Sequence, residues 1–403
     1  MSMTEERAGR PIDTTLDPVP DLLERAAALT PLLREHASSN EELGRLSDTT
    51  INALKSEGLL HFCAPREVGG LAVGTLGALR VFERLMAAEG SAGWVPMVNN
   101  ICVTLLYYLE PDVARRFCQS GLPSIAGQGA PMGVAKPVSG GYRLTGEWSY
   151  GSGIHFADYV LASCVLHDSD GCPTVNSLGL PDARIFLVPI EEVTLGGNWD
   201  VLGLKATGSV DYSIADVFVP ADTGIDILND PVFGAPASAV EFSSWAMVAH
   251  TAAALGLGRR ALDEAAEVLV RPKGPAGCAA QHEHIQIAFA KAEATMRSAR
   301  AFAYEVWEDI ETSIATEGSL STRQRTLQRL VLLHTTHAAE EVATCAYRFG
   351  SGASLRDSPL QRAFRDMQSA AQHILVSEPF YRYCGEELLG ISEERTWRLY
   401  GLL

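Results

Sequence analysis

The sequence predicts an α+β protein whose three parts follow one another as helices, strands and helices. Apolar residues recur at steps of three and four between about 18 and 120, which is the period of an amphipathic helix. Between about 124 and 222 the pattern changes to short β-branched runs separated by turn residues. From about 238 onward it is helical again and rich in alanine. We therefore expect an N-terminal helical domain (1–123), a β-barrel or sandwich domain (124–235) and a C-terminal four-helix bundle (236–403).

Each part has its own local signals. The first carries helical segments at LLERAAALTPLLREHA, EELGRLSDTTINALKSEGLL and LGALRVFERLMAAEG, and Ser47 or Asp48 is suited to cap the second of them. The proline and glycine pair of HFCAPREVGGLAVG predict a turn after it. In the second part, strands such as ADYVLASCVLH and ARIFLVPI succeed one another without intervening helices, so we expect an antiparallel sheet. Four long segments with short loops in the third part predict an antiparallel bundle.

Composition excludes several classes of protein. The 403 residues are 47% hydrophobic, which is enough for a large core. A formal charge of −17, without any basic run, disfavours nucleic acid or anionic membranes as partners and leaves a small-molecule substrate. The polar start MSMTEERAGRPID lacks the apolar core of a signal peptide, and no apolar stretch is long enough to span a membrane, so we expect a cytoplasmic protein. The eight cysteines lie far apart without a CxxC pair and predict isolated buried thiols.

Three segments carry candidate chemistry: EWSYGSG (147–153), NWDVLGLKATGSVDYSIADVFVP (198–220) and RDMQSAAQHILVSEPF (365–380). A Gly-Ser-Gly run lets the backbone approach a planar ring while one small hydroxyl donates a hydrogen bond, although such a run is also typical of an ordinary turn. His373, in the third segment, can act as an acid or a base near neutral pH. A single histidine on a helix is more often an ordinary, partly buried side chain.

Read together, these segments resemble the acyl-CoA dehydrogenase superfamily of flavoproteins, and the resemblance covers essentially the whole chain. In the dehydrogenases an Arg-Asp pair is followed by a loop whose glutamate removes the substrate α-proton, and that position here is Ile374. An alkyl side chain cannot take a proton. The resemblance therefore points to the branch of two-component flavin-dependent monooxygenases, which includes hydroxylases and N-oxygenases and has a histidine at the position of His373.

The resemblance also implies which residues contact the flavin. The Gly-Ser-Gly segment corresponds to the strand end that lines the isoalloxazine ring, with the hydroxyl of Ser152 near flavin N5. Lys205 stands where arginine is more usual, which leaves a bidentate contact there in doubt. Arg271 corresponds to an arginine that binds the flavin phosphate of a neighbouring subunit, although a helix C-terminus also favours arginine without any ligand. The cofactor-binding residues expected from the resemblance are Trp94, Gln128, Tyr150, Ser152, Gly153, Thr207, Arg271, Gly350 and Ser351.

Two catalytic residues follow from the same resemblance. Reduced FMN or FAD would activate O2 as a C4a-(hydro)peroxyflavin, Ser152 would form a hydrogen bond near N5, and His373 would deprotonate the substrate. Members of this branch commonly carry another histidine a few residues after the position of Trp94. Asn99 and Asn100 occupy that stretch here, so no second catalytic histidine is expected.

The resemblance implies a homotetramer and a separate NAD(P)H:flavin reductase, because no nucleotide-binding βαβ unit is present to accept NADH. The favoured reaction is oxygenation of a small aromatic or indolic compound at carbon. N-oxidation of an amine or amino sugar and S-oxidation remain open. So do a dehydrogenase whose base has moved to Glu378 and a flavin-free structural protein.

Other motifs are set aside. GLGRRA (256–261) matches a dinucleotide fingerprint, but it lies within a helical run without a preceding strand, so close helix packing explains it better. HTTH (334–337) and HEH (282–284) lack the further ligands of a metal site, and no metal is expected.

Overall fold

The computed structural model describes residues 17–176, 179–228, 231–234, 240–272, 277–393, 395–398 and 401–402. The polar N-terminal segment and the expected domain boundary at 235/236 lie outside these residues. The order of helices, strands and helices is confirmed.

Among the residues that the structure describes, six α-helices form the N-terminal part. Ser47 caps one of them, as expected, because its hydroxyl accepts a hydrogen bond from the Thr50 amide. Glu89 separates two others: its backbone is extended and its carboxylate accepts a hydrogen bond from the Ala92 amide. The helices are α1 (Val19–Glu35), α2 (Ala37–Leu43), α3 (Asp48–Ser56), α4 (Thr75–Ala88), α5 (Gly90–Val103) and α6 (Pro111–Phe117).

The central strands form one mixed sheet in the order β1-β4-β2-β3-β7-β6, with β5 paired to β4. Most pairs are antiparallel, as expected, but β4 runs parallel to both β1 and β2. The reason is the crossover after the β2–β3 hairpin, which returns the chain to the other side of β2. The strands are β1 (Ile125–Ala126), β2 (Gly133–Val138), β3 (Gly141–Trp148), β4 (Tyr159–Leu166), β5 (Ala183–Pro189), β6 (Thr194–Leu195) and β7 (Tyr212–Pro220).

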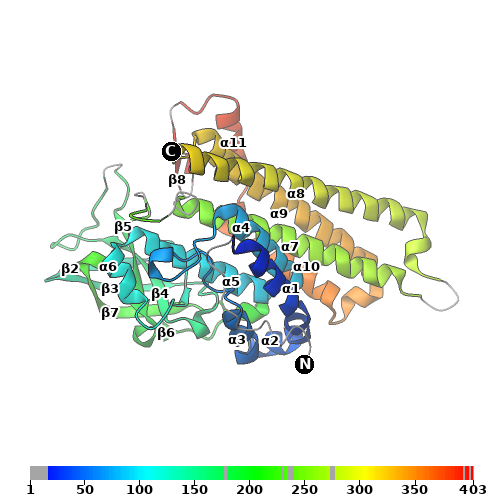
Figure 1. The fold of residues 1–403 in the computed structure, drawn as a ribbon, viewed down its shortest axis with the longest axis horizontal. Coiled ribbons are helices and arrows are strands. Elements are labelled where there is room, and N and C mark those ends of the chain that lie inside the picture. Colours follow the sequence, from blue (N-terminus) through cyan, green and yellow to red (C-terminus); the bar gives the residue numbers. More distant parts are fainter. Residues whose placement is uncertain are drawn as a thin grey trace.

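Three long helices and two shorter ones form the C-terminal part, so the fourth helix of the expected bundle is divided. The break between the two short helices contains His373 and a 3₁₀ turn, Ile374–Val376. Figure 1 shows α7, α8 and α9 side by side, extending away from the sheet. The elements are α7 (Phe242–Val270), α8 (Glu283–Glu317), α9 (Thr322–Gly350), α10 (Pro359–Ala370) and α11 (Pro379–Leu388), followed by the hairpin β8 (Trp397–Arg398) and β9 (Gly401–Leu402).

Helix α7 lies at the centre of the molecule, in contact with α4, α5, α9 and α10. Its small residues permit this packing. A Cβ atom at Gly256 would lie 2.6 Å from the Glu83 carbonyl oxygen and 2.9 Å from the Ala87 nitrogen, both backbone atoms of α4. The GLGRRA motif is therefore a helix-packing contact, as expected. One large hydrophobic core joins the N-terminal helices to the bundle, and a second fills the sheet domain around Trp148 and Tyr212.

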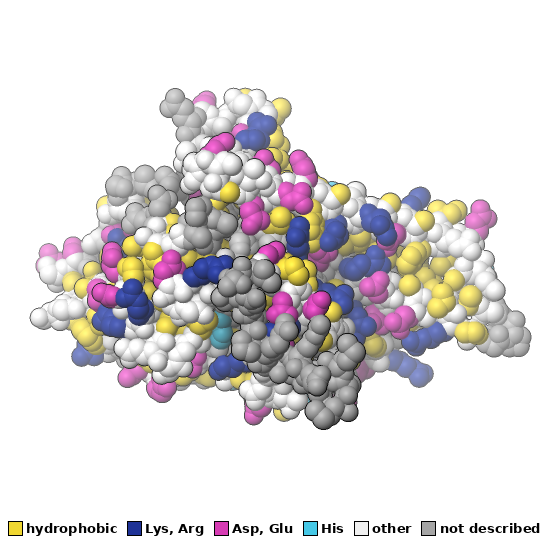
Figure 2. All heavy atoms as spheres, viewed as in Figure 1, with side chains coloured by type: hydrophobic (Ala, Val, Ile, Leu, Met, Phe, Trp, Pro, Cys, Tyr) yellow, Lys and Arg dark blue, Asp and Glu magenta, His cyan; other side chains and the backbone are white. Residues whose placement is uncertain are grey.

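The surface mixes charges of both signs. Figure 2 shows acidic and basic side chains interspersed over the bundle, with hydrophobic side chains gathered at the end away from the sheet. Val270 and Ile287, at that end, are 61% and 49% exposed. All eight cysteines are free, but Cys172 is exposed and three others are only partly buried, which corrects the expectation of buried thiols. None of the described helices is both long and apolar enough to cross a membrane.

The packing of α7 on α4 predicts the effect of one added methyl group. We expect Gly256→Ala to lower the free energy of unfolding by about 1–3 kcal/mol, because the methyl group collides with backbone that cannot rotate away. The matched control is Gly385→Ala in α11, where a Cβ meets nothing within 4 Å. That change should be neutral or slightly stabilising, since alanine favours helix over glycine. Urea unfolding of both variants measures the difference, and equal effects would contradict the packing.

Candidate functional site

A chain of buried hydroxyl groups lies between the end of β3 and the segment before β7. The Trp94 indole Nε1–H donates to Ser152 Oγ at 3.2 Å. Ser152 Oγ lies 2.7 Å from Ser209 Oγ, which in turn lies 2.7 Å from Thr207 Oγ1. Thr207 Oγ1–H donates to the Leu204 carbonyl at 2.8 Å. The tertiary structure thus brings together residues that are up to 115 positions apart in the sequence.

The two ends of this chain determine the direction of every hydrogen bond in it. An indole N–H can only donate, and a carbonyl can only accept. Each hydroxyl has one proton, so Thr207 donates to Leu204, Ser209 donates to Thr207 and Ser152 donates to Ser209. The proton of Ser152 is therefore already engaged. This corrects the expectation that Ser152 donates to a ligand, because what it offers outward is a lone pair.

Trp94 joins the hydroxyl chain to a pair of histidines. The indole packs edge-on against the His250 ring, with centroids 5.5 Å apart and an interplanar angle of 88°. His250, from α7, lies against His373, with ring centroids 3.9 Å apart and planes at 34°. No histidine lies near Asn99 on α5, but α7 places His250 against His373, a contact that the sequence did not predict.

Both histidines are held neutral. Burial lowers the pKa of His250 to about 4, against the opposing effect of the Ala246 carbonyl. Burial also lowers the pKa of His373 well below its ordinary value, and the neighbouring His250 lowers it further. Two cationic rings in this contact would repel each other, so near neutral pH the pair can accept or donate a proton without starting from a charge.

A small cavity adjoins His250. It measures about 10 Å³, close to the space that one water molecule needs. Helices α5, α7, α9 and α10 and the 3₁₀ turn after His373 contribute its walls, which are lined by Trp94, His250, Ala253, Ala254, Thr336, Met367, Ala370 and Val376. A larger cavity of about 550 Å³ lies between α1, the 66–77 segment and α8. It shares no residue with the histidines or hydroxyls, so we do not assign the chemistry to it.

The backbone of residues 202–204 is fastened to α10 by three hydrogen bonds. Arg365 donates to the Leu202 carbonyl at 2.8 Å, the Gly203 amide donates to Ser369 Oγ at 2.9 Å, and the Leu204 amide donates to Asp366 Oδ1 at 2.6 Å. Gly203 has to be glycine because a Cβ there would collide with the Arg365 carbonyl. Leu204 adopts a left-handed conformation with φ 53°, held by the bonds at both its amide and its carbonyl. We call these three bonds the α10 clamp.

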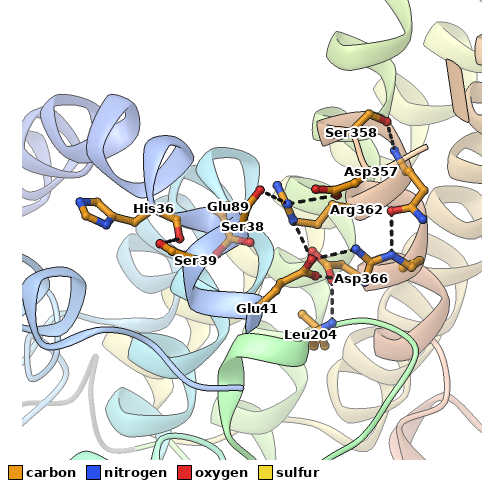
Figure 3. Close-up of polar contacts among 12 residues, drawn as sticks. His36, Ser38, Ser39, Glu41, Glu89, Leu204, Asp357, Ser358, Arg362 and Asp366 are labelled. Atoms are coloured by element: carbon orange, nitrogen blue, oxygen red, sulfur yellow. Dashed lines mark hydrogen bonds and ion pairs between the residues drawn. The ribbon is translucent and has the colours of Figure 1, made fainter. Parts of the chain in front are cut away.

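Ion pairs surround the clamp. The Arg365 guanidinium donates to both carboxylate oxygens of Glu41, and Arg362 lies 3.2 Å from the same carboxylate. Figure 3 shows Glu41, Arg362 and Asp366 where α2, α10 and the loop at Leu204 meet.

Burial and the nearby Glu89 carboxylate raise the pKa of Asp366 to about 8, and burial raises that of Glu89. This pair of carboxyls therefore retains a proton near neutral pH.

Three other expected cofactor residues lie around the hydroxyl chain at different depths. The buried Gly153 donates from its amide to the Thr207 carbonyl at 2.9 Å, which ties the two segments together. Tyr150 is 66% exposed, has φ 66° and packs edge-on against Trp199. Gln128 is partly buried, and its side-chain carbonyl accepts a hydrogen bond from the Ala130 amide two residues ahead.

The remaining expected residues lie at the other end of the bundle. Arg271 follows His250 by 21 residues, or about 32 Å along a helix, and forms an ion pair with Glu267 on its own helix. Gly350 and Ser351 end α9, 14 and 15 residues beyond Thr336, or about 21 Å away. Figure 1 shows both helix ends pointing away from the sheet. Within one chain they cannot share a site with His373.

Reasoning from the sequence missed three residues of this site. His250 has a weak signal, a lone histidine in an alanine-rich helix, and nothing local indicates that it meets His373. Asp366 belongs to the Arg-Asp pair but had no assigned role, and Glu89 was not considered. Ile374 is 64% exposed and Glu378 is also exposed, at the start of α11, so neither belongs to the histidine pair. Among the described residues, no group of three or more His, Cys, Asp or Glu side chains is placed to hold a metal ion.

Comparisons with protein families agree with this architecture. Residues 25–121 match the N-terminal domain model of acyl-CoA dehydrogenase, and residues 248–378 match its C-terminal domain model. The chain is 30% identical over 353 residues to indole-3-acetate monooxygenase of Pseudomonas putida, and the alignment covers 86% of this chain and 87% of that protein.

Solved structures show the same fold at lower identity. The HsaA monooxygenase of Mycobacterium tuberculosis superposes with a TM-score of 0.85 at 22% identity, covering 95% of this chain and 99% of that one. XiaF from a Streptomyces species, solved with FADH2 and glycerol, gives a TM-score of 0.84 at 22% identity, covering 92% and 96%.

The raised pKa of Asp366 predicts how stability depends on pH. Above the ordinary Asp pKa, the unfolded chain has released the Asp366 proton, whereas the folded chain keeps it up to about pH 8. The contribution of this group to stability should therefore fall as the pH rises from about 4 to about 8, by at most about 1.4 kcal/mol per pH unit. Urea unfolding of the wild type and of Asp366→Asn across this range should show the wild type losing stability relative to the variant. The control, Asp112→Asn, removes an exposed carboxylate on α6 and should not reproduce this relative loss.

Proposed function

The chain belongs to the flavin-dependent monooxygenases of the acyl-CoA dehydrogenase fold, and we propose that it is the oxygenase component of a two-component system. In this proposal a separate NAD(P)H:flavin reductase supplies reduced FMN or FAD, and O2 is the co-substrate. One oxygen atom enters a small aromatic or indolic substrate and the other leaves as water. Solved relatives of the same fold hold FADH2 in one case and FMN in another, and the choice between the two flavins stays open.

The proposal rests mainly on one arrangement: Trp94 contacts both the hydroxyl chain and the neutral histidine pair. In addition, the exposed hydrocarbon side chain of Ile374 stands where a dehydrogenase needs its base. The arrangement can hold a proton and orient polar atoms. It offers no carboxylate at that position to abstract a proton from a thioester, so a dehydrogenase with its base at Glu378 is disfavoured.

The donor set fits a reduced flavin. A bound reduced flavin would supply the electron pair that activates O2. The free lone pair of Ser152 Oγ would accept a hydrogen bond from a ring N–H, which the reduced isoalloxazine has at N5. Gly151 and Gly153 on either side are set by packing, because a Cβ at either position would lie less than 3 Å from Ile154 or Val95. Thr207 and Ser209 hold Ser152 in place by fixing the direction of its proton.

The substrate would meet the histidine pair. Trp94, Met367 and Val376 make the wall beside His250 apolar, and apolar surroundings strengthen hydrogen bonds to an imidazole. An apolar wall with two neutral polar groups suits an aromatic compound with one polar substituent better than a charged amino sugar. This favours oxygenation of an aromatic compound over the N-oxygenase alternative.

A homotetramer forms part of the proposal. Arg271, Gly350 and Ser351 lie at the end of the bundle where hydrophobic side chains gather on the surface. Contact with another copy at this end would cover those side chains and could bring the three residues to a flavin phosphate in a neighbouring subunit, for which a guanidinium is well suited.

Isotope labelling tests the function. The protein, mixed anaerobically with reduced FMN or FAD and then with ¹⁸O2 and a panel of phenols and indoles, should give product that contains one labelled oxygen. The comparison experiment adds an acyl-CoA to the protein with oxidised flavin in the absence of air. Flavin reduction by the thioester, without labelled product in the first experiment, would show a dehydrogenase and refute the proposal.

Removing the His373 ring should uncouple the reaction. We expect His373→Ala to retain reduced-flavin binding and to lower product formation by about 10²-fold or more, the usual effect of removing a polar group that contacts the reacting atoms. O2 would then be released as hydrogen peroxide. Product and peroxide are quantified together, and His334→Ala, an exposed histidine on α9, serves as the control. Wild-type yields from His373→Ala would remove His373 from the mechanism.

A further inference from the structure

We propose that the two histidines have opposite roles, with His250 as the proton acceptor and His373 as the hydrogen-bond donor to the substrate. This inference rests on the proposed function and assigns the base to a residue from α7, not to the histidine that follows the Arg-Asp pair. It comes from the backbone groups that each imidazole contacts.

His250 carries its proton on Nδ1 when it is neutral. Nδ1 lies 2.8 Å from the carbonyl oxygen of Ala246, one turn earlier in α7. A carbonyl oxygen can only accept a hydrogen bond, so Nδ1 must donate. Because a neutral imidazole has one N–H, Nε2 is left as a lone pair. His250 therefore offers a basic nitrogen on the edge of its ring that lies away from its own helix backbone.

His373 has the opposite tautomer. Its Nδ1 lies 3.3 Å from the backbone nitrogen of Leu375, and the side chain caps the 3₁₀ turn that begins at the next residue. A backbone amide can only donate, so Nδ1 must accept and the single proton lies on Nε2. Nε2 cannot accept a proton in this state. The free nitrogen of His373 is therefore a donor.

The surroundings keep the two roles distinct. The ring contact disfavours placing a second positive charge on the pair, so only one imidazole takes a proton at a time. The side chains that line the cavity beside His250 from α5, α9, α10 and the turn after His373 are Trp94, Thr336, Met367, Ala370 and Val376, and none of them ionises in this pH range. No charged group among these neighbours competes for the proton.

A lone pair beside an N–H matches a substituent that both donates and accepts, which points to an aromatic ring bearing a hydroxyl group. The substrate O–H would donate to His250 Nε2 while His373 Nε2–H donates to the same oxygen. Transfer of the proton to His250 leaves the electron pair on that oxygen and makes the ring carbon nucleophilic toward the O2-derived electrophile. An indole N–H would use His250 alone.

The tautomers can be measured without flavin or substrate. Long-range ¹H–¹⁵N spectra of the histidine-labelled protein distinguish Nδ1–H from Nε2–H rings, and the signals are assigned from His250→Gln and His373→Gln. We expect His250 as the Nδ1–H form and His373 as the Nε2–H form at neutral pH. The same tautomer in both rings, or the reverse assignment, would overturn the inference whether or not the protein proves to be an oxygenase.

The same variants separate the roles in catalysis. A glutamine at 373 keeps an N–H near the position of Nε2, so His373→Gln should lose no more than about tenfold in phenol oxygenation and should recover much of what His373→Ala loses. A glutamine at 250 can accept a hydrogen bond but cannot hold a proton, so His250→Gln should lose about 10²-fold or more. His334→Gln is the matched control on the surface of α9.

The outcomes separate the two hypotheses. Equal losses in His250→Gln and His373→Gln, or a larger loss in the latter, would contradict the division of roles. No labelled product from the wild type with any phenol or indole would count against the proposed function instead, and the NMR result would still decide the tautomers.

Discussion

The α10 clamp is the constraint on which the rest of the site depends. Three backbone groups of residues 202–204 bond to side chains of α10, and the absence of a side chain at Gly203 allows this approach. On the loop side, Leu204 accepts a hydrogen bond from Thr207, which belongs to the hydroxyl chain. On the helix side, α10 ends three residues before His373. The relative position of the two functional groups is thus set by a contact to which neither belongs.

The structure keeps charge away from the reacting groups. The carboxylates and guanidinium groups gather on the α2 side of α10, where Glu41 pairs with Arg362 and Arg365, and the buried Asp366 retains a proton with Glu89. On the other side, the hydroxyl chain and both imidazoles are neutral. Neutral dipoles in an apolar wall orient a polar substituent without the desolvation cost of a buried ion.

Trp94 has two roles. Its N–H begins the hydroxyl chain and so sets the direction of the Ser152 proton, while its ring edge packs against His250. The side chain is also buried, as that of an ordinary core tryptophan would be. Burial and function coincide here because a buried N–H requires a partner, and that partner is the first hydroxyl of the chain.

The sequence by itself determined the order of helices, strands and helices, the Ser47 cap, the helix-packing role of GLGRRA and the positions of Ser152, Thr207 and His373 in three distinctive segments. These follow from periodicity, turn chemistry and short motifs, which are local properties. Only the tertiary structure decided that β4 runs parallel to two neighbours, that Ser152 offers a lone pair, that Arg271 lies far from His373, and that His250 faces His373 across 123 residues of sequence. Those facts depend on which segments meet and on which backbone groups occupy the remaining hydrogen-bonding positions, and a local pattern contains neither.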